Sequence, residues 1–586
     1  MMGSIFFSCI WIVLMVSFIL YKKTEKKMPL ITWLTIGGVL STCYHSFIAG
    51  VFSAVRIPVN LFSLGIADGV IAAVLIVQVL RSKSLQRYSL DLFDIVFVGI
   101  VVAEIYHLYH ARYFGNSLMI NYTTIDPAQH LKAAMDIVNQ QKVQGMYHSS
   151  LSNAIILNIL MPFTGVSKTY MSFVIADLLN LGLAGLSVYS LGKAFVKDFY
   201  GKLVILFLAV FYMKGYPLMN LMYGFVYLGM CVTIIAVLFI LVHYYLQDSF
   251  DAVFLIAAIA LGCLGVFECY MLFMPVTYFA IITCVFWKQF QKHKLVSWNT
   301  VWICLGMFLI PCIVGLGYSY FGTFGDELTV GSQFALEGAT YRDLYTNFLF
   351  LLPVALWILW KMLRERENSI LLVYTVYTAL FVGAQLILCV KGKVSSYYFY
   401  KNYFLLWMVI FALSMYAVSK FQKSEKTFFS MMLVSVGIMA YMYIGNIEAK
   451  LQEKNAMLIP VVKSHIFFDV YQYNRAVCSI QHQNPQKVQL FSYVEENFIE
   501  EENCMVPIVS YWEDAYWYEG ISNQRFTNWN YVTLDLETYL QQLKAQNAKY
   551  VLVMRDSELY TTNQEYFEAL TKVYDGGIGY VAEVEK

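Results

Sequence analysis

Charged residues are scarce in this chain of 586 residues. Asp, Glu, Lys and Arg make up 13% of the sequence, against about a quarter in soluble domains, whereas apolar residues make up 59%. The mean hydropathy is +0.58. So few charges cannot cover the wetted surface of a protein of this length, which excludes an entirely soluble protein and indicates an integral membrane protein.

Several chemical motifs are missing as well. The sequence has no CxxC, HExxH or comparable metal-ligand spacing, no Walker or Gly-rich nucleotide fingerprint, and no internal repeat. No basic stripe accompanies a folded segment, so a nucleic-acid partner is not expected. Most of the 11 cysteines lie in apolar runs. Only Cys478 and Cys504 lie in the C-terminal part, and whether they are bonded or free stays open.

The charges that are present are divided unevenly along the chain. Residues 446–586 contain 11 Lys or Arg and 20 Asp or Glu, a balance of −9, which leaves +10 for the preceding residues. Basic clusters, such as the one at 22–27, follow alternate apolar segments. The positive-inside bias therefore predicts a cytoplasmic location for these clusters and an extracytoplasmic one for the acidic part.

The apolar segments predict a polytopic α-helical membrane protein with about 13 to 15 spans. We expect additional transmembrane helices at 1–90 and a transmembrane catalytic domain at 91–445 with a long outer loop at 111–150. The apolar segment 151–163 is too short to cross hydrocarbon easily, so we interpret it as a re-entrant or interfacial helix on the outer side. Residues 446–586 form the predicted extracytoplasmic domain.

The C-terminal part has the pattern of a small α/β domain. Segments 505–511 and 550–554 resemble buried strands, 534–546 has helical spacing, and 578–584 follows a Gly-rich turn as a last strand. The segment 511–519 mixes aromatic and acidic residues. It could hold carbohydrate, but packing against the membrane domain is the preferred interpretation.

The first outer loop contains the strongest candidate for chemistry. Asp126 precedes Pro127, which suits the first turn of a helix, and His130 lies one turn further on the same face. A helix cap would account for Asp126 about as well. However, Glu104 lies near the end of the preceding span, and ionisable groups near membrane depth are costly enough to suggest a function.

A second group of polar residues lies in a short outer loop near residue 400. Tyr397, Tyr398, Tyr400 and Lys401 follow one another closely there. Lysine suits a lipid-linked phosphate, and tyrosine offers hydroxyl groups and flat faces for sugar rings. The alternative is an aromatic belt with a lysine that extends to water. Glu268 interrupts an apolar stretch at another predicted outer corner, where it either pairs with a neighbouring helix or meets a substrate.

These features together resemble the GT-C superfamily, membrane glycosyltransferases that use polyprenyl-phosphate-linked sugars. The likeness begins at Asp91, with a span leading outward, a long outer loop in which an Asp starts a short helix, many later spans and an outer C-terminal domain. Residues 394–403 resemble the SxYYxxK-type loop of some bacterial members.

The resemblance implies a transferase in a bacterial cell membrane that moves a sugar from a polyprenyl-phosphate donor to a cell-surface glycan or related acceptor. Asp126 would then be the catalytic base. The groups for the donor phosphate would be Lys401, Arg112 and Lys132, and those for the acceptor or the cavity wall would be His130, Glu268, Tyr397, Tyr398, Tyr400 and Glu104.

Some alternatives stay open at this point. Asp126 and Glu268 could share a divalent cation, although no ligand spacing argues for one and no cofactor is expected with certainty. A lipid-linked-oligosaccharide flippase or transporter would have paired broken helices in two related halves, and these are not evident. A polysaccharide polymerase or ligase would share the donor chemistry.

Overall fold

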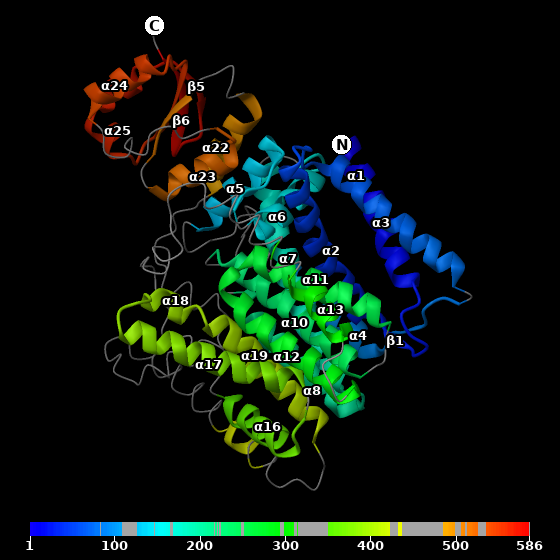
Figure 1. Ribbon diagram of the computed structural model, residues 1–586. Helices are drawn as coiled ribbons and strands as arrows, with labels where there is room; N and C mark the ends of the chain where they lie inside the picture. Colours follow the sequence, from blue (N-terminus) through cyan, green and yellow to red (C-terminus); the bar gives the residue numbers. More distant parts are fainter. Residues whose placement is uncertain are drawn as a thin grey trace.

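The computed structural model shows a large helical part and a small domain with a sheet at the C-terminus (Figure 1). The structure describes all residues except 83, 108–125, 146, 165–167, 216, 219–220, 222–223, 248–250, 294–297, 310–312, 314–349, 368, 422–429, 431, 436, 438–484, 499–504, 510–511, 525–534 and 585–586.

The helical part is built from elements that are mostly apolar along their whole length. Its main helices are α1 Met2–Leu20, α2 Leu30–Ala54, α3 Leu61–Arg81, α4 Leu92–His107, α5 Asp126–Gln140, α6 His148–Leu160, α7 Lys168–Phe195, α8 Phe199–Lys214, α10 Val226–Leu246, α11 Ala252–Cys269, α12 Met274–His293, α13 Trp298–Cys304, α16 Leu352–Glu365, α17 Ile370–Val390, α18 Ser396–Tyr400 and α19 Tyr403–Ser419. A short parallel pair, β1 Met28–Pro29 and β2 Tyr88–Ser89, joins two of the connections.

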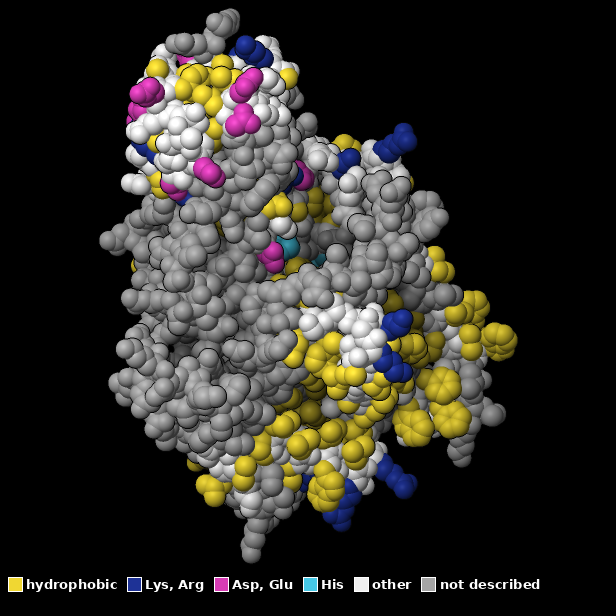
Figure 2. Space-filling view, turned by 90° about the vertical axis from the view of Figure 1, so that its left-hand side faces the viewer, with side chains coloured by type: hydrophobic (Ala, Val, Ile, Leu, Met, Phe, Trp, Pro, Cys, Tyr) yellow, Lys and Arg dark blue, Asp and Glu magenta, His cyan; other side chains and the backbone are white. Residues whose placement is uncertain are grey.

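The helical part is a multi-pass membrane domain. Nine segments within the described residues are long and apolar enough to cross a membrane. Hydrophobic side chains also spread over the lower half of the face in Figure 2. Helix α8 is a shorter apolar helix, and the total of 13 to 15 spans stays a prediction. The predicted fold class, a polytopic helical membrane protein with a small C-terminal α/β domain, is confirmed.

Helix α10 lies at the centre of the membrane domain. It is apolar on all sides. In its most apolar stretch of 18 residues, 83% of the residues are buried, against 22% in the corresponding stretches of the peripheral helices α1 and α3. A helix without a polar face is stable only when neighbours surround it. Helices α7, α11, α12 and α19 all pack against α10.

Helix α7 connects the two ends of the membrane domain. Near its start, the ring of Tyr170 lies 5.7 Å from that of Trp517 in the C-terminal domain. Near its end, Lys193 is 23 residues further on, which corresponds to about 35 Å along a helix. The C-terminal domain and Lys193 therefore lie at opposite ends of the membrane domain, as Figure 1 also shows for α23 and α8.

Helix α6 occupies the region predicted as a re-entrant or interfacial helix. Its 13 residues span only about 20 Å, too little to cross hydrocarbon. The preceding helix α5 contacts the C-terminal domain, and the following helix α7 starts beside it. The chain thus enters and leaves α6 at the same end of the membrane domain, as the interpretation of this segment requires.

The C-terminal domain contains a four-stranded sheet in the order β3-β4-β6-β5. Its strands are β3 Met505–Ile508, β4 Tyr550–Met554, β5 Lys572–Asp575 and β6 Gly579–Glu583. Strands β3 and β4 are parallel, and the other two pairs are antiparallel. The helices are α22 Pro485–Asn497, α23 Trp512–Ser522, α24 Leu536–Ala545, α25 Glu558–Thr562 and α26 Gln564–Glu568. The strands and the helix predicted from sequence are present, while β5 was not predicted.

The C-terminal domain rests on the membrane domain through α22 and α23. Helix α23 packs against α5, and Asn139 of α5 donates a hydrogen bond of 2.6 Å to Asn523. Glu495 of α22 accepts a hydrogen bond from Thr169 at the start of α7. The preferred interpretation of the aromatic and acidic segment 511–519, packing against the membrane domain, agrees with the position of Trp517.

Candidate active site

Lys401 lies buried in a group of aromatic rings at the end of the membrane domain that carries the C-terminal domain. Only 7% of its surface is exposed, and Nζ donates a hydrogen bond of 2.9 Å to the hydroxyl of Tyr227. The distances from Nζ to the ring centroids are 4.1 Å for Tyr397, 5.4 Å for Tyr227, 5.5 Å for Tyr398, 5.6 Å for Tyr270 and 5.8 Å for Phe225. We call the four tyrosines of this set the tyrosine cage. Ring faces attract a cation, so the cage offsets part of the lost hydration.

Asn402 fixes the turn that presents Lys401. This residue is completely buried between α18 and α19. Its amide nitrogen donates a hydrogen bond of 2.9 Å to the carbonyl of Phe399, and a second one to Gln385 of α17. These bonds hold α18 against α17, so the lysine cannot extend freely into water.

Asp126 reaches the same place from a distant part of the sequence. It is the first residue of α5, followed by Pro127, as the sequence predicts for a helix start. Gly224, just before α10, has φ +76°, and a Cβ there would lie 2.6 Å from the Cβ of Asp126 and 2.7 Å from Cδ of Pro127. Only glycine allows this approach, which holds the start of α5 against the start of α10.

His130 strengthens the contact between α5 and α10. Its ring centroid lies 5.6 Å from that of Tyr227, and its side chain hydrogen-bonds the backbone of Gly224. Burial lowers the pKa of His130 to about 4, against the effect of the Gly224 hydrogen bond and with a smaller contribution from the charge of Lys401. His130 is therefore neutral at pH 7.

The charges of Asp126 and Lys401 face each other. Burial raises the pKa of Asp126, while the positive charge of Lys401 opposes that rise. The two side chains interact electrostatically, but no direct ion pair joins them among the described residues. A carboxylate with a raised pKa is a stronger base than an exposed one, and a nearby cation favours its ionised form.

The tyrosine cage contains a hydroxyl group that could serve a ligand. Tyr270 follows α11 and is 5% exposed, and its hydroxyl has no hydrogen-bond partner among the described residues. A buried hydroxyl without a partner is costly, so this group is suited to donating to a bound molecule. Below the C-terminal domain, Figure 2 shows a hollow in which acidic and histidine side chains are visible.

The structure does not bring every predicted residue into this cluster. Glu268 is buried and accepts a hydrogen bond of 3.0 Å from Tyr147, which places it towards the connection between α5 and α6. Lys132 pairs with Asp136 on α5 at 3.3 Å. Tyr400 contacts Phe399, with ring centroids 5.3 Å apart, and Glu104 is half-buried on α4.

Three further predictions are not tested by the described residues. Arg112 lies outside the described residues, as do Cys478 and Cys504. Among the described residues, no group of three or more His, Cys, Asp or Glu could hold a metal ion. A shared divalent cation between Asp126 and Glu268 stays a hypothesis without a ligand set.

Sequence reasoning missed Tyr227, Tyr270 and Gly224. Tyr270 lies two residues after Glu268, at an outer corner predicted from the sequence, while Gly224 and Tyr227 lie beside the start of α10. Their aromatic and Gly character did not single them out in a chain with 45 tyrosines and 34 glycines. The available signal was their position beside the start of α10 and the end of α11, which converge on the loop containing Lys401.

Comparisons with known proteins add little. No family model matches the chain, and no curated protein matches it in sequence. Among solved structures, the chain is similar to the oligosaccharyltransferase of Archaeoglobus fulgidus in the apo form, with 12% identity and a TM-score of 0.37. The match covers 78% of this chain and 69% of that one. A likeness of this extent carries no conclusion about activity.

Proposed function

We propose that the protein is a GT-C-like membrane glycosyltransferase. It transfers a sugar from a polyprenyl-phosphate donor to a cell-surface glycan or related acceptor at the membrane face that carries the C-terminal domain. The observation that carries this proposal is the meeting of Asp126 and Lys401, which are far apart in sequence, beside the tyrosine cage.

Lys401 and the tyrosine cage suit the phosphate of the donor. When the bond between the sugar and the phosphate oxygen breaks, the phosphate keeps the electron pair and gains negative charge. A buried ammonium group stabilises that charge more strongly than one in water. Tyr227 already accepts a hydrogen bond from Lys401, and the free hydroxyl of Tyr270 can donate to a phosphate oxygen.

Asp126 suits the acceptor. The acceptor hydroxyl attacks the sugar carbon, and its proton passes to the carboxylate of Asp126. General bases of this kind contribute about 10²- to 10⁴-fold in rate. The raised pKa of Asp126 favours proton uptake, while the charge of Lys401 favours the ionised carboxylate before the reaction. The neutral ring of His130 leaves this balance undisturbed.

The substitution Asp126→Asn tests the proposal. It keeps the size and the first-turn position of the side chain but removes the base. We expect sugar transfer to fall by about 10²-fold or more. The measurement uses the purified full-length protein in liposomes with a synthetic polyprenyl-phosphate-linked sugar and a glycan acceptor.

Asp136→Asn is the matched control. Asp136 lies on the same helix and pairs with Lys132 near the surface, away from the tyrosine cage. This variant should transfer sugar at the native rate. Native turnover by Asp126→Asn would remove Asp126 from the mechanism, and movement of the donor across the liposome membrane without transfer would favour a flippase.

A further inference from the structure

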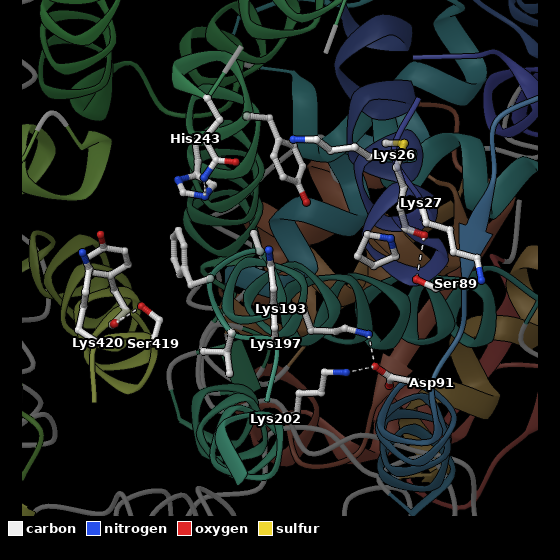
Figure 3. A pocket seen from close by; sticks show the side chains of 18 residues that line it. Lys26, Lys27, Ser89, Asp91, Lys193, Lys197, Lys202, His243, Ser419 and Lys420 are labelled. Carbon is white, nitrogen blue, oxygen red and sulfur yellow. Dashed lines mark hydrogen bonds and ion pairs between the residues drawn. The ribbon is translucent and has the colours of Figure 1, made fainter. Parts of the chain in front are cut away.

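A polar pocket lies at the opposite end of the membrane domain from the tyrosine cage. It has a volume of about 570 Å³. Helix α10 connects the two regions, with Tyr227 at its start and His243, which lines the pocket, near its end. Six lysines line the pocket: Lys26, Lys27, Lys193, Lys197, Lys202 and Lys420 (Figure 3). We call it the basic pocket.

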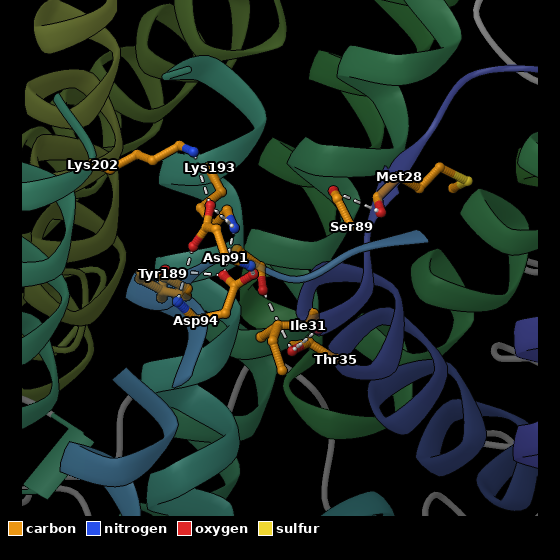
Figure 4. A network of polar contacts seen from close by, with 10 residues as sticks. Met28, Ile31, Thr35, Ser89, Asp91, Asp94, Tyr189, Lys193 and Lys202 are labelled. Carbon is orange, nitrogen blue, oxygen red and sulfur yellow. Dashed lines mark hydrogen bonds and ion pairs between the residues drawn. The ribbon is translucent and has the colours of Figure 1, made fainter. Parts of the chain in front are cut away.

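A network of ion pairs forms one wall of the basic pocket (Figure 4). Asp91 and Asp94 form a reciprocal capping box at the start of α4, with bonds of 3.0 Å and 3.1 Å. Lys193 pairs with both carboxylates, and Lys202 pairs with Asp91 at 2.8 Å. The hydroxyl of Tyr189 donates to Asp94 at 3.0 Å. Because Asp94 and Lys193 are buried, their ion pair holds the Lys193 ammonium group in place at this wall.

The lining carries an excess of positive charge. Among the described residues that line the basic pocket, Asp91 is the only acidic one. Even when Asp94 and Glu367, which pair with Lys193 and Lys420, are added, six lysines face three carboxylates. Lys197 is exposed and forms no ion pair among the described residues. The described part of the lining therefore carries a net positive charge.

The positions of the helix ends account for part of this positive charge, but they do not account for the arrangement of the lysines around one cavity. Helices α7, α10 and α19 all end here, and lysines next to helix C-termini are favourable because they face the unpaired carbonyl groups. The positive-inside bias also predicts an excess of lysines at this end, if it faces the cytoplasm. Neither effect requires the lysines to surround one cavity, yet in Figure 3 they approach it from several sides, with Lys420 opposite Lys193 and Lys202.

The surroundings favour a lipid as the occupant. The lining also includes Met28, Phe195 and Val196, so one part of the pocket is apolar. Close by, Phe199 and Tyr200 at the start of α8 are 63% and 74% exposed. Exposed aromatic residues at the end of a span are typical of the level of lipid headgroups. Contact with the apolar side chains would stabilise a lipid but not a soluble anion.

We propose that the basic pocket binds the phosphate headgroup of an anionic phospholipid from the leaflet at this face. The lysines hold the phosphate, and the apolar side accommodates the glycerol and the first part of the acyl chains. Basic pockets between transmembrane helices bind anionic headgroups in this way. This site is independent of the proposed transfer reaction.

The test uses the detergent-solubilised full-length protein with short-chain phosphatidylglycerol, phosphatidylcholine and inorganic phosphate as probes. Native mass spectrometry measures how much lipid is bound at each concentration. We expect phosphatidylglycerol to bind about tenfold more tightly than phosphatidylcholine. The double variant Lys26→Gln/Lys197→Gln should weaken phosphatidylglycerol binding by about tenfold and leave phosphatidylcholine binding unchanged.

The matched control is Arg81→Gln/Lys292→Gln, which removes the same charge from exposed positions outside the basic pocket. It should bind phosphatidylglycerol as the native protein does. The proposal is overturned if both double variants lose affinity equally, if neither does, or if phosphatidylglycerol and phosphatidylcholine bind alike. Displacement of the lipid by inorganic phosphate at similar concentrations would assign the pocket to a soluble anion instead.

Discussion

Lys401 combines a positive charge with almost complete burial. An ammonium group buried without compensation would cost several kcal/mol. Here the tyrosine cage, the Tyr227 hydroxyl and the charge of Asp126 compensate for the lost water. A lysine in an ordinary aromatic belt extends to water instead. The 7% exposure of Lys401 contradicts that alternative for this residue.

Gly224 offers a test of how closely Asp126 must be placed. In Gly224→Ala, the new Cβ would lie 2.6 Å from the Cβ of Asp126, on a backbone with φ +76° that disfavours alanine. The start of α5 must then shift. Misplacement by about 1 Å can cost about 10²-fold in rate, so we expect transfer to fall at least tenfold.

The control is Gly99→Ala on α4, where a Cβ would meet nothing within 4 Å. This variant should keep the native transfer rate and thermal stability. If Gly224→Ala also transfers sugar at the native rate, the close contact between α5 and α10 does not position Asp126 for the reaction.

At the level of single residues, the sequence predicts the ionisable groups of the site better than its aromatic ones. Asp126 and Lys401 stand out because charges are rare in an apolar chain and costly near a membrane. Tyr227 and Tyr270 do not stand out, because aromatic residues are also frequent at membrane interfaces. Their role depends on how α10 and α11 pack, which one sequence does not specify.

Helix α5 is the element that connects the site to the rest of the molecule. Its first residue faces Lys401, while the side packed against α23 contacts the C-terminal domain. The C-terminal domain also contacts α7 through α22. The position of Asp126 therefore depends on how firmly this domain rests on the membrane domain.

Glu495 makes the contact between α22 and α7 sensitive to pH. Burial raises the pKa of Glu495 to about 7, although the hydrogen bond from Thr169 and the charge of Lys168 oppose the rise. An exposed glutamate has a pKa of about 4.3. Because the pKa is higher in the packed state, the contribution to packing is complete below about pH 4 and is lost as the pH rises through about 7.

We expect hydrogen exchange in α22 and at the start of α7 to be faster at pH 8 than at pH 6, after correction for the intrinsic exchange rate. Glu495→Gln cannot ionise and should show equal protection at both pH values. The exposed Glu558→Gln on α25 should behave like the native protein. Equal protection in the native protein at both pH values would contradict this account of Glu495.

Elements with a distinct apolar pattern are predicted well from the sequence, whereas elements without such a pattern are not. The apolar strand β4 has the bounds expected for it, because a short apolar run in a polar domain has few alternatives. Strand β5 at the sheet edge alternates between half-buried and exposed residues and carries charges, so it resembles a loop. The short helix α18 lies within a predicted loop, because its five residues are fixed by packing rather than by propensity.

For the molecule as a whole, the two ends of the membrane domain have different chemistry. One end combines the tyrosine cage, Asp126 and the C-terminal domain. The other end collects the six lysines of the basic pocket. Helices α7, α10 and α19 run between the two ends, so a transfer reaction at one face and lipid binding at the other would share the same rigid helices.

The sidedness of these groups is the most direct test of the central claim, because the proposed reaction requires Asp126 and Lys401 at one face. Single cysteines are introduced by Lys132→Cys, Lys393→Cys, Lys544→Cys and Lys197→Cys in a background in which all 11 native cysteines are replaced by serine, and intact cells are treated with a membrane-impermeant maleimide. We expect the first three to react and Lys197→Cys to react only after permeabilisation. Reaction of Lys132→Cys and Lys393→Cys from opposite sides of the membrane would contradict the account.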